Sequence, residues 1–238
     1  MIKLVLLDVD GTLTKNRNTE ALDPDAIAAV QDITGKYVVG LVTGNALIVT
    51  QALSLYIGLP KGSPLIAENG CIVDYRGGEI HELCEDLNLR EVALRLMKLI
   101  PGLRPTYQFN YRKFDITLWA PKEPHELVEV VKEELKRMNL DSKVRVSHSG
   151  YALHLQPINS SKAVAVKYLC NMMNIPCNEV VYIGDSDTDI EVMDVVGYGG
   201  VAVSNATDEL RKRAKLVLDK PSGKGVADFL RNYLPPRL

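Results

Sequence analysis

Short apolar segments alternate with amphipathic segments over both ends of the chain. Apolar runs of this length, bounded by turn residues, are typical of buried strands, and apolar positions at helical spacing are typical of helices that cover a sheet. The pattern predicts strands over 3–8, 37–42, 65–67, 179–183, 200–203 and 216–218, and helices over 24–34, 48–55, 162–173, 189–195 and 207–214. The helix over 48–55 has Ile48, Ala52 and Leu55 on one apolar face. This alternation favours a parallel sheet with helices on both faces.

The pattern changes between residues 84 and 153. Alternating apolar and polar residues predict half-buried strands, and apolar positions at helical spacing predict two more helices. The expected strands cover 114–119, 144–146 and 151–155, and the expected helices cover 89–99 and 124–138. Strands that present a polar face belong to a sheet that is open on one side. We therefore expect an α+β module over 84–153, inserted into a core made of 1–83 and 154–238.

The composition narrows the function classes. The 238 residues are 46% hydrophobic, which is enough for a sizeable core, and the formal net charge is −2. A net charge this close to zero shows no excess of the basic residues with which proteins bind nucleic acid. No apolar stretch reaches the length of a membrane span, and the apolar run at the N-terminus is too short, and too soon followed by acid, for a signal peptide. We expect a cytoplasmic protein with neither nucleic acid nor a membrane as its partner.

The cysteines add little to this picture. Cys71, Cys84, Cys170 and Cys177 form no CxxC pair, and their spacing fits no zinc site. In a cytosolic protein, reduced thiols are the ordinary expectation for all four.

Candidate chemistry gathers where the first strand ends. The apolar run is followed by Asp8-Val9-Asp10 and then by GTLT. Alternation along an extended chain sends Asp8 and Asp10 to the same side. Two carboxylates held together repel each other unless a cation lies between them, and hard oxygen ligands favour Mg²⁺. Because a carboxylate can also be a nucleophile, the pair fits either metal-assisted phosphoryl transfer or metal binding alone.

Further polar residues follow other expected strands. Thr43, with Gly44 and a helix start beyond it, can hold a phosphate oxygen, although a helix cap explains Thr43 equally well. Lys162 opens a helix, where it either stabilises charge on a phosphoryl group or is an ordinary solvated lysine. Asp185 and Asp189 follow an apolar strand, and acids this close together favour a cation. Ligands of open α/β sheets bind at the carboxyl ends of strands, so we expect these residues to meet.

The segment DVDGTLT at 8–14 resembles the first motif, DxDGTLx, of the haloacid dehalogenase-like phosphohydrolase superfamily. Thr43 is similar to the second motif of that family, Lys162 to the third, and GDSDTD at 184–189 to the fourth, GDxxxD. Thr188 departs from the Asn that many relatives of this branch carry. The resemblance covers essentially the whole chain.

The resemblance implies a Rossmann-like core, a Mg²⁺ cofactor and an aspartyl-phosphate intermediate. Asp8 is then the nucleophile, and Asp10 protonates the leaving oxygen before it deprotonates the attacking water. Asp185 completes the Mg²⁺ site with Asp8 and the Asp10 carbonyl, while Asp189 supports that site as a ligand or from behind the ligands. The implied substrate-binding residues are Thr43, Gly44, Asn45 and Lys162.

The spacing of the motifs locates the insertion. Asp10 to Thr43 leaves no room for a further domain, whereas Thr43 to Lys162 leaves far more than one strand–helix unit requires. This position resembles the type 2 cap of Cof-like phosphatases, sucrose-phosphate phosphatases and archaeal phosphoglycolate phosphatases, and the strings TGN, AENG and SNA are most similar to the last group. We predict an α/β fold, with a Rossmann-like parallel sheet core and an inserted smaller α+β cap domain.

The resemblance implies a Mg-dependent phosphatase that hydrolyses a small phosphomonoester, with 2-phosphoglycolate as the first substrate to try. A small acidic metabolite needs a cation in the pocket, and Arg112, Lys113 and Arg145 are candidates. A sugar-phosphate phosphatase or a phosphomutase of the same superfamily is the alternative. A Mg-independent dehalogenase is disfavoured by Asp10 and Asp185, and a silent binding module by the intact motifs. A homodimer is left open.

Overall fold

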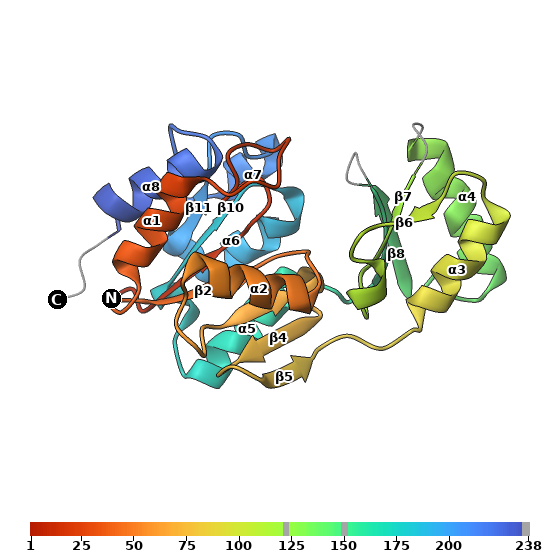
Figure 1. Cartoon of the computed structure of the whole chain (residues 1–238), viewed down its shortest axis with the longest axis horizontal. Helices are drawn as coiled ribbons and strands as arrows, with labels where there is room; N and C mark the ends of the chain where they lie inside the picture. Colours follow the sequence, from red (N-terminus) through yellow and green to blue (C-terminus); the bar gives the residue numbers. More distant parts are fainter. Residues whose placement is uncertain (121–123, 149–151, 235–238) are drawn as a thin grey trace.

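The computed structural model describes residues 1–120, 124–148 and 152–234, and two sheets organise them into two lobes (Figure 1). Within these residues, the larger lobe holds an eight-stranded sheet in the order β12-β11-β10-β1-β2-β3-β4-β5. Its strands are β1 (Leu4–Leu7), β2 (Val38–Val42), β3 (Leu65–Ala67), β4 (Ile72–Tyr75), β5 (Glu79–Glu82), β10 (Val180–Gly184), β11 (Gly200–Ala202) and β12 (Leu216–Val217). The pairs from β12 to β3 are parallel, and β4 and β5 form an antiparallel edge.

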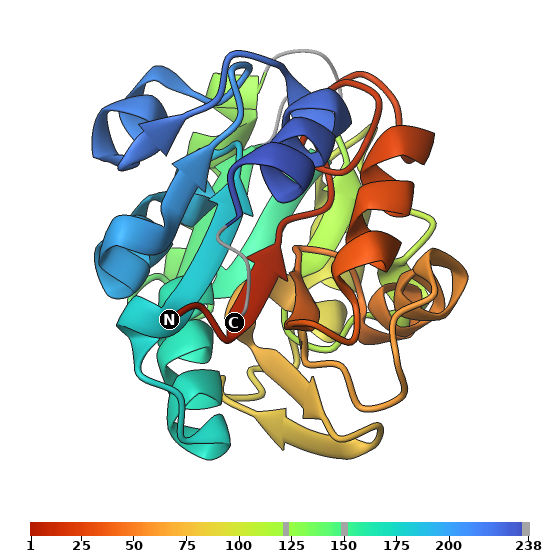
Figure 2. The same cartoon turned by 90° about the vertical axis from the view of Figure 1, so that its left-hand side faces the viewer.

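Helices cover both faces of this sheet, as the strand–helix alternation predicts. They are α1 (Pro24–Ile33), α2 (Leu47–Ile57), α5 (Lys162–Met173), α6 (Ile190–Val196), α7 (Asp208–Arg213) and α8 (Ser222–Asn232). Helix α1 packs against α8 on one face, and α5 packs against α6 on the other (Figure 2). Strand β1 lies in the middle with all four side chains buried, because both of its faces are covered. The predicted parallel core is confirmed.

Two helices differ from the sequence-based expectation. In α2 the apolar face assigned to Ile48, Ala52 and Leu55 is wrong, because Ile48 and Leu55 are exposed while Thr50 and Ile57 are buried. Apolar residues surround almost the whole of this helix, so its sequence does not single out one face. Helix α8 was missed, although its buried side chains pack beside α1.

The smaller lobe has a sheet and a core of its own. Its four strands are antiparallel in the order β6-β7-β9-β8, with β6 (Arg104–Pro105), β7 (Ile116–Trp119), β8 (Val144–His148) and β9 (Ala152–Pro157). Helices α3 (Leu89–Leu99) and α4 (Pro124–Arg137) cover its outer face, and the other face is turned towards the larger lobe (Figure 1). Strand β9 continues to Pro157, past the expected end of the module at residue 153. None of the helices in the described part of the chain is long and apolar enough to cross a membrane.

The expectation of four reduced cysteines is wrong for one pair. Cys71 and Cys84 form a disulfide, with their Cα atoms 5.0 Å apart, while Cys170 and Cys177 are free. The reason is the β4–β5 hairpin, which pairs Ile72 with Glu82 and is followed by a hydrogen bond from the Leu83 N–H to the Cys71 carbonyl, so that Cys84, the next residue, lies near Cys71. Spacing along the sequence hides this pairing, because the two cysteines are 13 positions apart.

Candidate active site

The predicted site residues gather at one edge of the large sheet. Strand β1 lies between β10 and β2, so Asp8, Asp185 and Thr43 follow three adjacent parallel strands. All three side chains are buried. Segments separated by more than a hundred residues therefore meet at the carboxyl ends of the strands, where open α/β sheets bind ligands.

Lys162 joins two of the aspartates. It opens α5 behind the N-cap residue Ser161, and its Nζ donates to Asp8 Oδ1 and to Asp189 Oδ1, both at 2.7 Å. Burial alone would lower the pKa of Lys162, but the charges of Asp189 and Asp8 outweigh it and raise this pKa. The amine therefore carries a positive charge in the centre of the site, and a solvated surface lysine is excluded.

Burial affects Asp8 in the opposite sense. It raises the pKa of the Asp8 carboxyl well above its usual range, although the charge of Lys162 opposes this shift. Asp8 Oδ2 is buried and has no hydrogen-bond partner among the described residues. One oxygen of Asp8 is thus held by Lys162, and the other is available to a ligand or a reacting atom.

Asp189 uses both of its oxygens to hold the loop that follows β10. Oδ1 accepts from Lys162 and from the Tyr182 hydroxyl at 2.5 Å, and Oδ2 accepts from the backbone N–H groups of Asp185 and Ser186 at 3.1 and 2.9 Å. Burial alone would raise the pKa of Asp189, but Lys162 and these hydrogen bonds lower it. Asp189 is therefore an ionised residue that positions Asp185 and Lys162.

Three carboxylates form a candidate metal centre. One oxygen each from Asp8, Asp185 and Asp189 lies within 4.8 Å of the others. Burial and the charge of Asp189 raise the pKa of Asp185 to about 6, while Arg17, whose Nε lies 2.6 Å from Asp185 Oδ2, opposes this. Lys162 and Arg17 balance part of this negative charge, and the all-oxygen donor set with one unpartnered oxygen fits Mg²⁺.

Gly11 allows the first motif to pass close to this centre. Its φ is +81°, and a Cβ atom there would lie 2.2 Å from Asp185 Oδ2. Only glycine combines this backbone conformation with so close an approach. Gly11 is therefore needed for the proximity of the first and fourth motifs.

Asp10 lies beside the predicted phosphate loop rather than in the three-carboxylate cluster. Its side chain is exposed, and Asn45 Nδ2 donates to Asp10 Oδ2 at 2.8 Å and to Thr43 Oγ1 at 3.0 Å. The protein around Asp10 raises its pKa by desolvation, against the opposing hydrogen bond from Asn45. Thr43 is not the cap of α2, since Ala46 occupies that position. The structure brings Asp10, Thr43 and Asn45 together.

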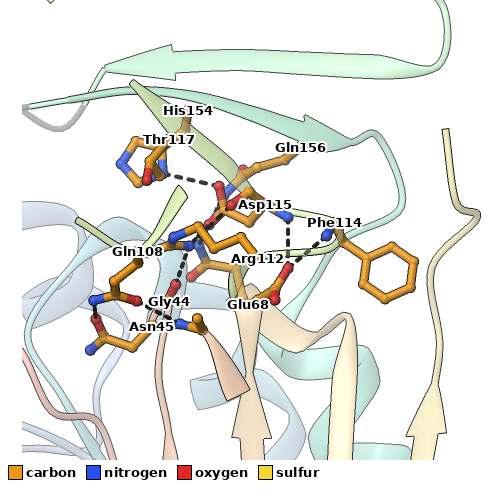
Figure 3. A network of polar contacts seen from close by, with 12 residues as sticks. Gly44, Asn45, Glu68, Gln108, Arg112, Phe114, Asp115, Thr117, His154 and Gln156 are labelled. Carbon is orange, nitrogen blue, oxygen red and sulfur yellow. Dashed lines mark hydrogen bonds and ion pairs between the residues drawn. The ribbon is translucent and has the colours of Figure 1, made fainter. Parts of the chain in front are cut away.

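The smaller lobe reaches this loop directly. Gln108 Oε1 accepts from the Ala46 N–H at 2.8 Å, and Gln108 Nε2 donates to Asn45 Oδ1 at 2.7 Å (Figure 3). Arg112 Nη1 donates to the Gly44 carbonyl at 2.8 Å. The two lobes therefore meet at the residues that flank Asp10.

A second contact between the lobes is centred on Glu68, which is fully buried beyond β3. Its carboxylate accepts the backbone N–H groups of Lys113, Phe114 and Asp115 at 2.6–3.0 Å (Figure 3). These bonds fix the segment that leads into β7. Sequence reasoning missed this role, because the partners of Glu68 are backbone groups that any residue supplies.

The three candidate cations of the insertion have different surroundings. Arg112 is buried against the loop at Gly44, whereas Lys113 is exposed and its Nζ pairs with Glu82 at 2.7 Å. Arg145 Nη2 donates to the Ser160 carbonyl at 2.6 Å. Of these three residues, Arg112 is the one whose side chain contacts the predicted phosphate loop, at Gly44.

Sequence reasoning also missed Arg17, Tyr182 and Gln108. Arg17 contacts Asp185, Tyr182 contacts Asp189, and Gln108 contacts Asn45. Tyr182 lies within an apolar strand and its position three residues before Asp185 is a signal that could have found it. The sequence around Arg17 and Gln108 contains no comparable signal.

Comparison with known proteins agrees with this geometry. A family model described as haloacid dehalogenase-like hydrolase matches residues 5–102 and 101–230. A curated phosphoglycolate phosphatase of Sulfolobus acidocaldarius is 35% identical over 235 residues, covering 98% of this chain and 97% of the relative. The phosphoglycolate phosphatase of Metallosphaera sedula is 38% identical over 231 residues, covering 97% and 98%.

Solved structures show the same fold. A Thermoplasma acidophilum protein superposes with a TM-score of 0.82 at 26% identity, covering 97% of each chain. A haloacid dehalogenase-like hydrolase of Bacteroides thetaiotaomicron has a TM-score of 0.79 at 20% identity, covering 98% of this chain and all of the other. With the family model matching nearly the whole length, the chain belongs to the haloacid dehalogenase-like hydrolases.

Proposed function

We propose that this protein is a Mg-dependent phosphatase that hydrolyses 2-phosphoglycolate to glycolate and phosphate. The observation that carries the proposal is Asp8, a buried carboxylate with one oxygen on Lys162 and the other without a partner. The substrate is suggested by the names of relatives that match 31–38% of residues over nearly the whole chain.

In the first step, the Asp8 carboxylate attacks phosphorus, and the bond from phosphorus to the ester oxygen breaks as the bond to Asp8 forms. Asp10 gives its proton to the leaving glycolate oxygen. Its raised pKa suits it to carry that proton, and Asn45 holds the carboxyl in place. In the second step, Asp10 takes a proton from water, which attacks phosphorus and releases phosphate from Asp8.

The phosphoryl oxygens need positive charge around them. Lys162 supplies a fixed cation, and the Thr43 hydroxyl and the backbone N–H groups of the loop at Gly44 supply donors. Mg²⁺, held by Asp8, Asp185 and the Asp10 carbonyl, would neutralise further charge on the phosphoryl group. Asp189 has both oxygens occupied, so we place it behind the metal ligands, where it orients Asp185.

The proposal is tested with Asp8→Asn, which removes the nucleophile and keeps the size of the side chain. Hydrolysis of 2-phosphoglycolate and of p-nitrophenyl phosphate should both vanish, while the thermal midpoint shows a folded protein. Asp194→Asn is the matched control, because Asp194 lies on the surface and pairs with Arg213. An Asp8→Asn protein that keeps a tenth of the wild-type kcat would exclude Asp8 as the nucleophile.

The metal is tested separately. Activity should be lost in EDTA and restored by Mg²⁺, with Ca²⁺ a poor substitute because it accepts larger and looser coordination shells. Full activity in chelator would point to another mechanism.

A further inference from the structure

Within the described part of the chain, Arg112 donates its hydrogen bonds through one nitrogen. Nη1 donates to the Gly44 carbonyl at 2.8 Å and to the Asp115 carbonyl at 3.1 Å, and it also lies 3.5 Å from Asp115 Oδ2. Nε is buried and has no hydrogen-bond partner among the described residues, and the hydrogen bonds that Arg112 donates to them do not involve Nη2. Nε and Nη2 form the edge of a guanidinium that binds carboxylates side-on with two parallel hydrogen bonds.

The acids near Arg112 do not cover this edge. Asp115 is fully buried, and its oxygens accept from Asn69 Nδ2 at 2.7 Å and Gln156 Nε2 at 3.1 Å and lie 3.2 Å from His154 Nδ1 (Figure 3). The Glu68 carboxylate is occupied by backbone N–H groups. Both acids are therefore satisfied by other donors, and the contacts of Asp115 with Arg112 are made at Nη1. A buried donor left without a partner is costly unless a ligand accepts from it.

Arg112 contacts the loop that holds the predicted catalytic and phosphate-binding residues. Gly44, which accepts from Arg112, stands between Thr43 and Asn45, and Asn45 binds Asp10. A substrate whose phosphoryl group is held by this loop would therefore need only a short connection for its other end to reach Arg112.

We propose that the Nε and Nη2 edge of Arg112 binds the carboxylate of the substrate, and that Asp115 positions this arginine. The site would select short phosphomonoesters in which a carboxylate lies one or two bonds from the ester carbon. This inference rests on the proposed function and names the group that gives it specificity. Lys113, the neighbouring cation, is paired with Glu82 and exposed, so it takes no part.

The test compares two substrates of nearly equal size. 2-Phosphoglycolate and ethyl phosphate share the phosphoryl group and the ester carbon, and only the first has a carboxylate. The measured quantity is the ratio of their kcat/KM values. Loss of a hydrogen bond to a charged group corresponds to about ten- to a hundredfold, so Arg112→Gln should lower this ratio by about that factor. Arg112→Lys keeps the charge without the two-donor edge and should recover only part of the ratio.

Controls separate the possible results. Lys113→Gln removes the adjacent cation and should leave the ratio unchanged. A loss of both activities in equal proportion with Arg112→Gln would overturn the proposal, because that result describes a contact that only holds the lobes together. If Arg112→Gln does not fold, the wild-type ratio decides, since a protein that hydrolyses both esters equally well has no carboxylate receptor. A wild-type protein that hydrolyses neither ester refutes the proposed function itself.

Discussion

At the scale of single residues, Lys162 is buried between two carboxylates that would repel each other without it. Its amine also meets the phosphoryl group in the proposed mechanism. We expect Lys162→Ala to lower kcat by about 10²–10³ for 2-phosphoglycolate and p-nitrophenyl phosphate alike, as is typical when one group that stabilises developing charge is removed. Lys167→Ala, on the exposed side of the same helix, is the control and should keep wild-type rates. A loss confined to one substrate would contradict this role.

Asp115 should make the stability of the fold depend on pH. Burial alone would raise the pKa of Asp115, but the charges and hydrogen bonds of His154, Arg112 and Gln156 lower it. Because the folded pKa is lower than the unfolded one, the ionised carboxylate stabilises the fold above the unfolded pKa of about 3.9, and this contribution is lost as the pH falls through the folded pKa.

We therefore expect Asp115→Asn to lower the free energy of unfolding by about 1–3 kcal/mol at pH 7, with a difference from wild type that shrinks below about pH 4. Urea unfolding at several pH values measures this difference. Asp141→Asn, on the surface, serves as the control. A difference that stays constant down to pH 3 would mean that the charge of Asp115 is not what stabilises the fold.

The sequence was sufficient to predict that the residues at the strand ends would lie together. Asp8, Thr43 and Asp185 meet because parallel strands align their carboxyl ends, whatever the intervening chain does. The orientation of Arg112 could not be predicted, because it depends on Asp115 and on a backbone carbonyl in the other lobe. Its neighbour Lys113 has the same charge and points to Glu82. Composition cannot distinguish two adjacent cations whose side chains leave the backbone in different directions.

At the scale of elements, the strand β1 could be predicted from the sequence, whereas the buried face of the helix α2 could not. Strand β1 was predictable, because burial on both faces demands a continuous apolar run. The buried face of α2 was not, because Leu47–Ile57 is apolar nearly all round and tertiary packing selects Thr50 and Ile57. The disulfide was missed for a related reason, since the β4–β5 register that brings Cys71 to Cys84 is a property of the pairing.

The disulfide closes a loop of known length and should stabilise the protein. Cys71 and Cys84 are 13 residues apart, and a loop of that size is worth about 3 kcal/mol in the chain-entropy account, or about 6–12 °C in the thermal midpoint. Replacing both cysteines by Ser should cause this loss and remove the effect of reductant. Cys177→Ser is the control, because Cys177 is a free thiol. If reductant breaks the bond, as shown by thiol counting, and the wild-type midpoint does not move, the disulfide contributes nothing.

At the scale of the whole molecule, two lobes with separate cores meet through polar contacts and through a small apolar cluster, in which Phe114 packs with Ala67, Cys71 and Ile72 (Figure 1). Gln108 and Arg112 contact the loop at Gly44–Ala46, and Glu68 holds the segment 113–115 (Figure 3). Polar contacts of this kind can open more easily than a large apolar interface. The proposed chemistry at Asp8 and the proposed recognition at Arg112 therefore depend on how firmly the smaller lobe is docked.

Glu68 allows docking to be changed without touching the reacting groups. Its carboxylate accepts three backbone N–H groups, whereas the amide of Glu68→Gln has one acceptor oxygen and presents donors to donors. We expect amide hydrogen exchange at Phe114 and Asp115 to become faster, and kcat/KM to fall about equally for 2-phosphoglycolate and ethyl phosphate. The ratio of the two values should stay close to wild type, in contrast to Arg112→Gln.

Glu82→Gln, which removes only the exposed partner of Lys113, should change neither exchange nor rate. Unchanged exchange at Phe114 and Asp115 in Glu68→Gln would show that the lobes are held together by other contacts, and a changed ratio would show that docking itself sets specificity.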